Sequence, residues 1–296
     1  MSNLKEIKKR IGSTKSMRQV TRTMEMVSTA KIRGAQNRIE GTRPYIEALA
    51  KILASVTKAT KAIEHPLLDV RPETKRVMII SIASDRGQAG AFNANIVHAT
   101  EKLVAERQAL GQEIDLVCCG KKVVDYFHRR GIEPALINQG LSGRPMYEDV
   151  RVIANHAIDE YSNASVDEII VVSNHFISVG TQRVEKVTLL PATVDDLEGE
   201  VAETDEHKTE LEYIFEPSAE SVLEKLLPTF VEALVYRSLL ESAAAEHAAR
   251  RAAMKAATDS ADGMIKTLTR SFNRARQAAI TTEIAEIVGG AAALED

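Results

Sequence analysis

A narrow apolar repeat runs through both ends of this chain and limits the folds open to it. From residue 4 to about residue 61, apolar side chains recur every three or four positions between polar and charged ones. This spacing is typical of a coiled-coil seam, which is narrower than the apolar face of a helix on a globular core. The sequence predicts one long helix here, on the order of 85 Å at ~1.5 Å per residue. Pro44 is expected to kink this helix, and His65–Pro66 to end it. The predicted seam comprises Leu4, Ile7, Ile11, Met17, Val20, Met24, Val27, Ile32, Ala35, Ile39, Ile46, Leu49, Leu53 and Val56.

The C-terminal end carries a second repeat of the same kind. After Glu216–Pro217 we expect a short helix, and Pro228 is suited to the first turn of a new one. From there to about Val288 only Gly263 interrupts the helical pattern, until Gly289–Gly290. The predicted seam comprises Met254, Ala257, Ala261, Met264, Leu268, Ser271, Ala275, Ala278, Thr282 and Ala285. Two long helices with narrow seams at opposite ends of a chain favour an antiparallel coiled coil.

The middle of the chain follows a different pattern, in which apolar β-branched runs alternate with helical stretches. Strands are expected at 76–84, 114–120, 135–137, 167–174 and 182–192, and helices at 94–109, 121–130 and 148–163. Such alternation favours a mostly parallel sheet between two layers of helices. The fold class predicted is therefore α/β plus coiled coil, with a Rossmann-like three-layer domain inserted between the long helices. The expected domains are 1–61, 62–216 and 217–296.

Charge is distributed unevenly along the chain. Residues 1–61 carry 14 Lys and Arg against four Asp and Glu, although the whole chain has a net charge of −4. Residues 195–212 are strongly acidic and are expected to form a solvated loop. The basic helix could be a solvated face, could lie along nucleic-acid phosphates, or could meet an acidic protein. Because no aromatic residues are interleaved with its charges for base stacking, we do not expect nucleic-acid binding.

Two glycine-containing turns are candidate phosphate sites, and neither has the complete pattern. The turn at 84–96 offers Gly87 and Gly90, whereas a dinucleotide fingerprint needs three glycines. The segment CGKK at 119–122 resembles the end of a P-loop, but Asp115 stands where the first glycine belongs. Lys122 also stands where serine or threonine is required. We therefore expect structural turns rather than nucleotide sites.

Nothing else in the sequence has the pattern of a catalytic centre. The seven histidines show no metal-binding spacing, and GLSG at 140–143 does not have the form of a nucleophile elbow. His247 is expected on the surface, and Cys118 and Cys119 are expected to be buried, reduced thiols.

No apolar run approaches the ~20 residues of a membrane span, and the N-terminus lacks a signal peptide's apolar core. We expect a non-enzymatic, cofactor-free protein of a reducing cytosol.

Five segments, in the right order, resemble the γ subunits of F-type ATP synthases. They are LKEIKKRI (4–11), VTRTMEMVSTAKIR (20–33), SDRGQAGAFN (84–93), AARRAAMKAATDSA (248–261) and FNRARQAAITTEIAEIVGGAAA (272–293). The resemblance covers essentially the whole chain. Gln88–Ala89 departs from the Leu–Cys of many members, and the regulatory cysteine insertion of chloroplast members is missing. These features, without a transit peptide, indicate a bacterial protein on the cytoplasmic face of the plasma (inner) membrane.

The resemblance implies a rotating central stalk, which couples rotation of the c-ring, driven by proton flow, to the catalytic β subunits. The α, β and ε subunits and the c-ring are then its partners, with the membrane reached only through the complex and no lipid insertion. Implied contacts with the α/β ring are Arg10, Met24, Lys31, Arg33, Arg250, Arg251, Arg276 and Gln277. Implied contacts with the c-ring and ε are Arg43, Tyr45, Glu212 and Tyr213.

Two other classes of protein remain open at this point. A coiled-coil scaffold would explain the two long helices, but not the small side chains of the C-terminal seam. A nucleotide-binding α/β enzyme would explain the middle of the chain, but not its coiled-coil flanks.

Overall fold

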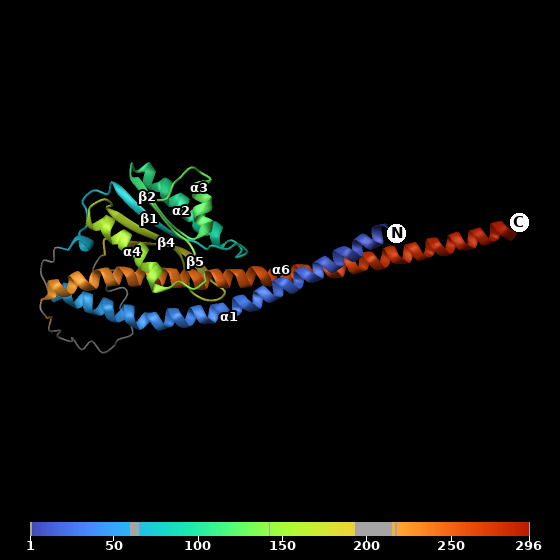
Figure 1. The fold of residues 1–296 in the computed structure, drawn as a ribbon, viewed down its shortest axis with the longest axis horizontal. Coiled ribbons are helices and arrows are strands. Elements are labelled where there is room, and N and C mark those ends of the chain that lie inside the picture. The colour runs from blue at the N-terminus through green and yellow to red at the C-terminus, as the bar shows by residue number, and fades with distance from the viewer. Residues whose placement is uncertain (1, 60–64, 142, 193–214, 217, 296) are drawn as a thin grey trace. The chain divides into compact units, whose positions relative to one another are not determined.

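A computed structural model describes residues 2–59, 65–141, 143–192, 215–216 and 218–295 (Figure 1). The chain divides into two compact units, one of Met1–Ser28 with Arg250–Asp296 and one of Thr29–Ala249. The elements are α1 (Ser2–Ala59), the 3-10 turn η1 (Pro66–Leu68), β1 (Arg76–Ile82), α2 (Phe92–Ala109), β2 (Glu113–Cys119), α3 (Lys121–His128), β3 (Leu136–Asn138), α4 (Tyr147–Ser162), β4 (Glu168–Phe176), β5 (Gln182–Leu190) and α6 (Ala219–Glu295).

The sheet of the larger unit has five strands in the order β3-β2-β1-β4-β5. The first four run parallel, whereas β5 pairs antiparallel with β4 at the edge. This matches the predicted alternation of strands and helices and the predicted edge strand. Parallel strands require crossover connections, and the helices between them supply these connections.

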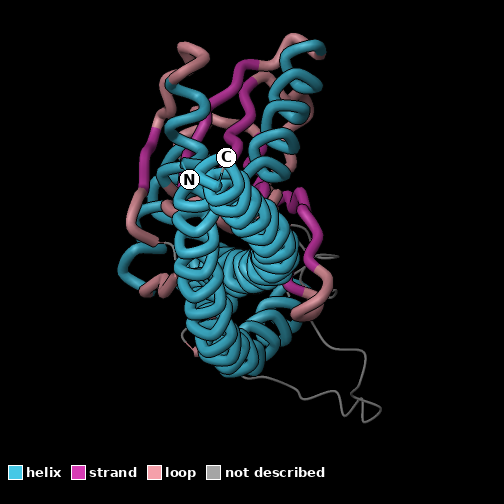
Figure 2. The backbone as a smooth tube through the Cα atoms, turned by 90° about the vertical axis from the view of Figure 1, so that its right-hand side faces the viewer, coloured by secondary structure: helices cyan, strands magenta, loops and turns pink. Residues whose placement is uncertain are grey.

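Helices cover both faces of the sheet, so the predicted three-layer arrangement is confirmed (Figure 2). Alternate residues of each strand face opposite layers. On β1, Ile80 packs in the core formed with α1, α4 and α6, whereas Ile79 packs in the core formed with α2 and α3. Burial on both faces explains why the strands read as continuous apolar runs.

Within the larger unit, α1 and α6 form one wall of the main core. Leu49 and Leu53 of α1 are buried in the same cluster as Leu227 and Phe230 of α6. The prediction that a new helix begins at Pro228 is wrong, because Pro228 lies inside a continuous helix. A proline inside a helix costs about 3 kcal/mol, which burial of the neighbouring large side chains can offset. Pro44 likewise lies inside α1 without ending it.

In the smaller unit, α1 and α6 pair through polar side chains. Thr21 and Thr258 are 6% and 7% exposed, and their hydroxyl oxygens lie 2.8 Å apart. Arg18 Nη1 lies 3.0 Å from Asp262 Oδ1. As the residue number rises on α1 it falls on α6, so the two helices are antiparallel, as predicted.

The predicted seam of α1 is wrong between Met17 and Val27. Met17, Val20 and Val27 are 60%, 55% and 51% exposed, whereas Thr21 and Ser28 are buried. Continuing the three–four spacing back from Ile32 leads to these hydroxyl residues. The helix therefore keeps its period and places polar side chains in the seam.

The predicted seam of α6 is partly wrong for the same reason. Met254 and Ala261 are buried as expected, but Thr258 is buried between them and Met264 is 55% exposed. The described side chains from 280 to 290 are all exposed, including the predicted seam positions Thr282 and Ala285. Gly289–Gly290 does not end the helix, which continues to Glu295. Glycine in a helix costs only about 1 kcal/mol relative to alanine.

Candidate interaction surfaces

The turn after β1, a candidate phosphate site by its sequence, is occupied by its own side chains. The Asp85 carboxylate accepts hydrogen bonds from the backbone amides of Lys121, at 3.0 Å, and Gly140, at 3.1 Å. Lys121 is the first residue of α3, so this carboxylate lies at the helix N-terminus where a phosphate would bind. Asp85 thus takes up the amides of Lys121 and Gly140, which a phosphate could otherwise use.

The crevice at the carboxyl ends of β1 and β4 is also filled. Doubly wound sheets bind ligands at this point, where the strand order reverses. Here Ala89 and Phe92, which follow β1, pack with Phe176 at the end of β4 and with Ala245 and Ala249 of α6. The long helix therefore occupies the usual ligand position of such a sheet.

The CGKK segment has a packing role. Gly120 has a φ of +99°, and a Cβ there would lie 2.3 Å from the carbonyl oxygen of Ala83. Only glycine permits this close approach of two backbones. Cys118 and Cys119 are free and buried, as predicted. Burial raises the pKa of Cys118 to about 12 and also raises the pKa of Cys119, so both stay protonated at neutral pH.

We expect the isolated chain to neither bind nor hydrolyse ATP, because Asp85 and α6 occupy the two places where a nucleotide could bind. Isothermal titration of the purified full chain with MgATP should give no stoichiometric heat of binding. One equivalent of ATP bound with micromolar affinity, about −8 kcal/mol, would contradict this interpretation.

Six of the eight predicted contacts with the α/β ring lie on the two helices of the smaller unit. Arg10 is exposed and lies 3.3 Å from Glu6 on its own helix, and Met24 is half-buried. Arg250 is 8% exposed. Arg251 is half-buried, and its Nε is buried without a hydrogen-bond partner among the described residues. Arg276 and Gln277 are both exposed.

The remaining predicted contacts lie in the larger unit or outside the described residues. Lys31, Arg33 and Arg43 are exposed, and Tyr45 is 52% exposed. Glu212 and Tyr213 fall outside the described residues. The roles of all these residues in binding stay predictions.

His247 is not on the surface, as the sequence predicted, but 2% exposed. Its Nε2 lies 3.5 Å from the carbonyl oxygen of Gly143. The helical pattern could not reveal this burial, because it depends on the distant segment that connects β3 to α4.

Sequence reasoning missed an apolar stripe on the outer side of α1. We call Met17, Val20, Met24 and Val27 the α1 stripe, since they recur at helical spacing on one side of the helix. Three of the four are more than half exposed. Their spacing is visible in the sequence, but apolar character alone assigns them to the seam.

A second exposed stripe lies near the end of α6. Ile280, Ile284, Ile287 and Val288, here called the tail stripe, are 46–71% exposed and share one side of the helix. The isoleucine spacing of four and three was the available signal for this stripe.

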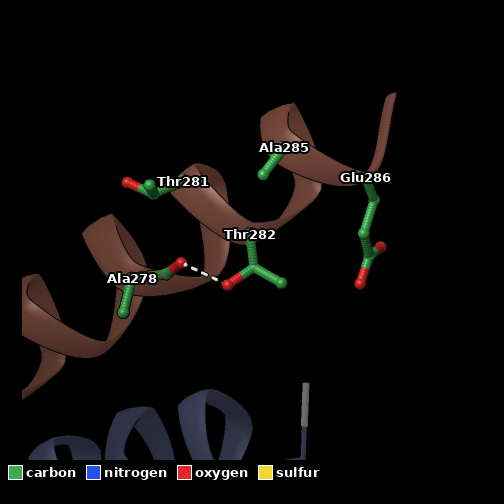
Figure 3. A pocket seen from close by; sticks show the side chains of 5 residues that line it. All are labelled: Ala278, Thr281, Thr282, Ala285 and Glu286. Atoms are coloured by element: carbon green, nitrogen blue, oxygen red, sulfur yellow. Dashed lines mark hydrogen bonds between the residues drawn. The ribbon is translucent and has the colours of Figure 1, made fainter. Parts of the chain in front are cut away.

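The shallow pocket beside the tail stripe has small or polar walls (Figure 3). Ala278, Thr281, Thr282, Ala285 and Glu286 line it, all from α6. The Thr282 hydroxyl donates to the carbonyl oxygen of Ala278 at 3.0 Å. Because every wall comes from one helix, this pocket is a helix surface rather than an enclosed binding site.

Among the described residues, no group of three or more His, Cys, Asp or Glu side chains is arranged to hold a metal ion. No described helix combines the length and hydropathy required to cross a bilayer.

Comparison with known proteins gives one consistent result. A family model described as ATP synthase matches residues 3–294. The ATP synthase gamma chain of Pelotomaculum thermopropionicum is 43% identical over 295 residues, which cover 100% of both chains. The fold is similar to a chain of the Euglena gracilis mitochondrial ATP synthase, with a TM-score of 0.68, 16% identity, and coverage of 99% of this chain and 95% of that one. It is also similar to a chain of the Tetrahymena thermophila mitochondrial ATP synthase central stalk and c-ring. That comparison has a TM-score of 0.58 and 22% identity, and it covers 80% of this chain and 99% of that one. The chain therefore belongs to the ATP synthase gamma-chain family and is a non-catalytic central-stalk subunit of the rotor.

Proposed function

We propose that this subunit turns inside a ring of α and β subunits and transmits rotation of the c-ring, driven by proton flow, to the catalytic sites of the β subunits. In this way it also regulates ATPase activity and ion flow. The observation that carries the proposal is the tail stripe. A helix that exposes four large apolar side chains, in a stretch with no buried side chains from 280 to 290, has an apolar surface that a partner would cover.

The composition of this surface suits a rotating contact. Small and hydroxyl side chains surround the tail stripe, and Thr281 and Thr282 each satisfy their hydroxyl on their own helix. Such a surface makes few directional bonds to any one neighbour. The free energy of binding then varies little with angle, so the barrier to rotation stays low.

The α1 stripe and the basic residues of α1 suit a different contact, one that transmits torque. Residues 1–61 carry a net charge of +10, and acidic loops on the β subunits would be attracted to this surface. Arg10, Lys31 and Arg33 are exposed on α1 and available for such contacts. Each orientation of the helix would then favour a different conformation at each catalytic site.

We assign the contact with the c-ring and the ε subunit to Arg43, Tyr45, Glu212 and Tyr213. Arg43 and Tyr45 are exposed on α1 and could face a partner. The subunit is placed on the cytoplasmic face of a bacterial plasma membrane, held there by the c-ring without insertion into lipid.

A matched pair of charge reversals on α1 tests the assignment of the two contacts. In complexes with Arg33→Glu, the rate at which the α/β ring hydrolyses ATP should be stimulated about tenfold less, because the new carboxylate would repel the acidic loops of the β subunits. Binding of ε should be unchanged. Arg43→Glu should weaken binding of ε and leave the stimulation of ATP hydrolysis unchanged. Co-purification with α, β and ε, followed by an ATPase assay, measures both effects.

Two outcomes would count against the proposed function. One is that both variants lose ATPase stimulation and ε binding to the same extent, which would mean that the two surfaces are not distinct. The other is purification of the chain as a homodimer that captures no α, β or ε subunit, which is the behaviour of a scaffold.

A further inference from the structure

A cavity of about 370 Å³ lies between α1, α4 and α6 in the larger unit, outside every surface discussed so far except for Tyr45. Its lining residues are Thr42, Tyr45, Ile46, Tyr147, Ala233 and Tyr236. Three of these six are tyrosines, although the whole chain has only six. Half of the chain's tyrosines therefore meet at one cavity.

The tyrosine rings are held in a defined arrangement. The rings of Tyr147 and Tyr236 meet edge to face, with centroids 5.7 Å apart and planes at 85°. Tyr45, at 52% exposed, leaves the cavity accessible to solvent. Tyrosines from three helices therefore line one cavity that is open to water.

A carboxylate adds negative charge next to one of these tyrosines. The Tyr147 hydroxyl donates a hydrogen bond to Glu232, whose side chain is 15% exposed. Burial, followed by this hydrogen bond and the charge of Glu232, raises the pKa of Tyr147. A phenol that donates to a carboxylate has a more electron-rich ring. Arg151 Nε, 4.0 Å from Glu232, belongs to a side chain that is 60% exposed and therefore offsets the charge only in part.

We propose that this cavity binds a small organic cation with an alkylated ammonium group, of the choline type. Electron-rich aromatic faces attract such cations, and alkylated ammonium ions are weakly hydrated and fill apolar walls. Thr42 can accept a hydrogen bond from a ligand hydroxyl, since its own hydroxyl donates to the carbonyl oxygen of Arg38 at 2.6 Å. This inference does not rest on the proposed rotary function, but Tyr45 is also assigned to the contact with the c-ring and ε, so the isolated chain is used to test it.

The chain's own fluorescence can report this binding. It contains no tryptophan, so its intrinsic emission comes from tyrosine, and three of the six tyrosines line the cavity. Choline chloride, titrated into the purified full chain at constant ionic strength, should change this emission saturably. The neutral isostere 3,3-dimethyl-1-butanol should bind at least about tenfold more weakly, because it lacks the charge that interacts with the rings.

Three substitutions locate the site. Tyr236→Leu should weaken choline binding about tenfold, whereas Tyr236→Phe should retain it because the aromatic face remains. Tyr126→Leu is the matched control, since Tyr126 lies on α3 against Arg130 and away from the cavity. If Tyr236→Leu does not fold, as judged by circular dichroism, Glu232→Gln replaces it, with binding again expected to weaken.

The proposal is overturned if choline gives no saturable change, or if the neutral isostere binds equally well. It is also overturned if Tyr126→Leu weakens binding as much as Tyr236→Leu. None of these results would affect the assembly and ATPase predictions, so a failure here is distinguishable from a failure of the proposed rotary function.

Discussion

Gly120→Ala should destabilise the α/β unit by several kcal/mol, on the order of 3–5, which is enough to prevent folding of a marginally stable protein. A Cβ at this position would lie 2.3 Å from the Ala83 carbonyl oxygen and 2.8 Å from the carbonyl carbon. Ala83 directly follows β1, and its amide donates to the Cys119 carbonyl oxygen at 2.8 Å, so its backbone cannot move away cheaply. The residue also has φ +99° and ψ 143°, a conformation that side chains other than glycine rarely adopt.

Gly111→Ala provides the matched control for this prediction. Gly111 also has a positive φ, of +78°, but nothing lies within 4 Å of an added Cβ. Its replacement should cost only the left-handed backbone strain of about 1–2 kcal/mol. Urea unfolding of the purified chains measures both changes in the free energy of unfolding. Equal losses would mean that the contact with Ala83 does not explain the glycine at position 120.

A double charge substitution in the tail stripe, Ile284→Asp with Ile287→Asp, should greatly reduce assembly with the α/β ring and its ATP hydrolysis. If a partner covers this stripe, each carboxylate would lose its hydration, at a cost of at least about 2 kcal/mol. Together the two would weaken association on the order of a thousandfold. The isolated chain should keep its stability, because Ile284 and Ile287 are 56% and 71% exposed.

The control for the tail stripe uses the other side of the same helix. Thr282→Asp with Ala285→Asp adds the same two charges where the surface is already small and polar. This variant should assemble and hydrolyse ATP better than the stripe variant. ATPase assays on reconstituted complexes compare the two. The tail stripe would lose its assigned role if both variants behaved alike, or if the stripe variant had full activity.

The sheet was predictable because its strands are buried on both faces. Continuous β-branched runs such as residues 76–82 have few alternative folds, and the crossover helices between them fix their parallel direction. The predicted strand and helix limits lie within a few residues of those observed. The order of the strands and the filled crevice beside Phe92 depend on three-dimensional contacts, and no local pattern contains them.

The coiled coil was predictable in its existence but not in its register. The apolar residues of α1 suggested that Met17 and Val20 face α6, yet Thr21 occupies the buried position. The hydrophobic effect alone would favour the methionine inside. Instead, the Thr21 hydroxyl faces α6 and lies 2.8 Å from the hydroxyl of Thr258. Counting back in sevens from the buried Ala35 leads to Ser28 and Thr21, whereas residue polarity points to Met17 and Val20.

The individual ring contacts were predictable only through the family resemblance. Exposed basic residues such as Arg10 and Arg33 have no local signature that separates a binding contact from a solvated one. The tail stripe could have been found from its isoleucine spacing, but whether it is exposed depends on where α1 ends its pairing with α6. The tyrosine cavity joins residues from positions 45, 147 and 236, so its formation depends entirely on the fold.

Rotation of this chain within an assembled complex tests the central claim most directly. The α/β ring would be immobilised, and a visible probe attached through Lys102→Cys on α2, where the native side chain is 75% exposed. Cys118 and Cys119 will not compete for the label, because both are buried with raised pKa values. On addition of ATP the probe should turn in one direction, with pauses at regularly spaced angles. A probe that stays fixed while the same complexes hydrolyse ATP would contradict a rotating central stalk.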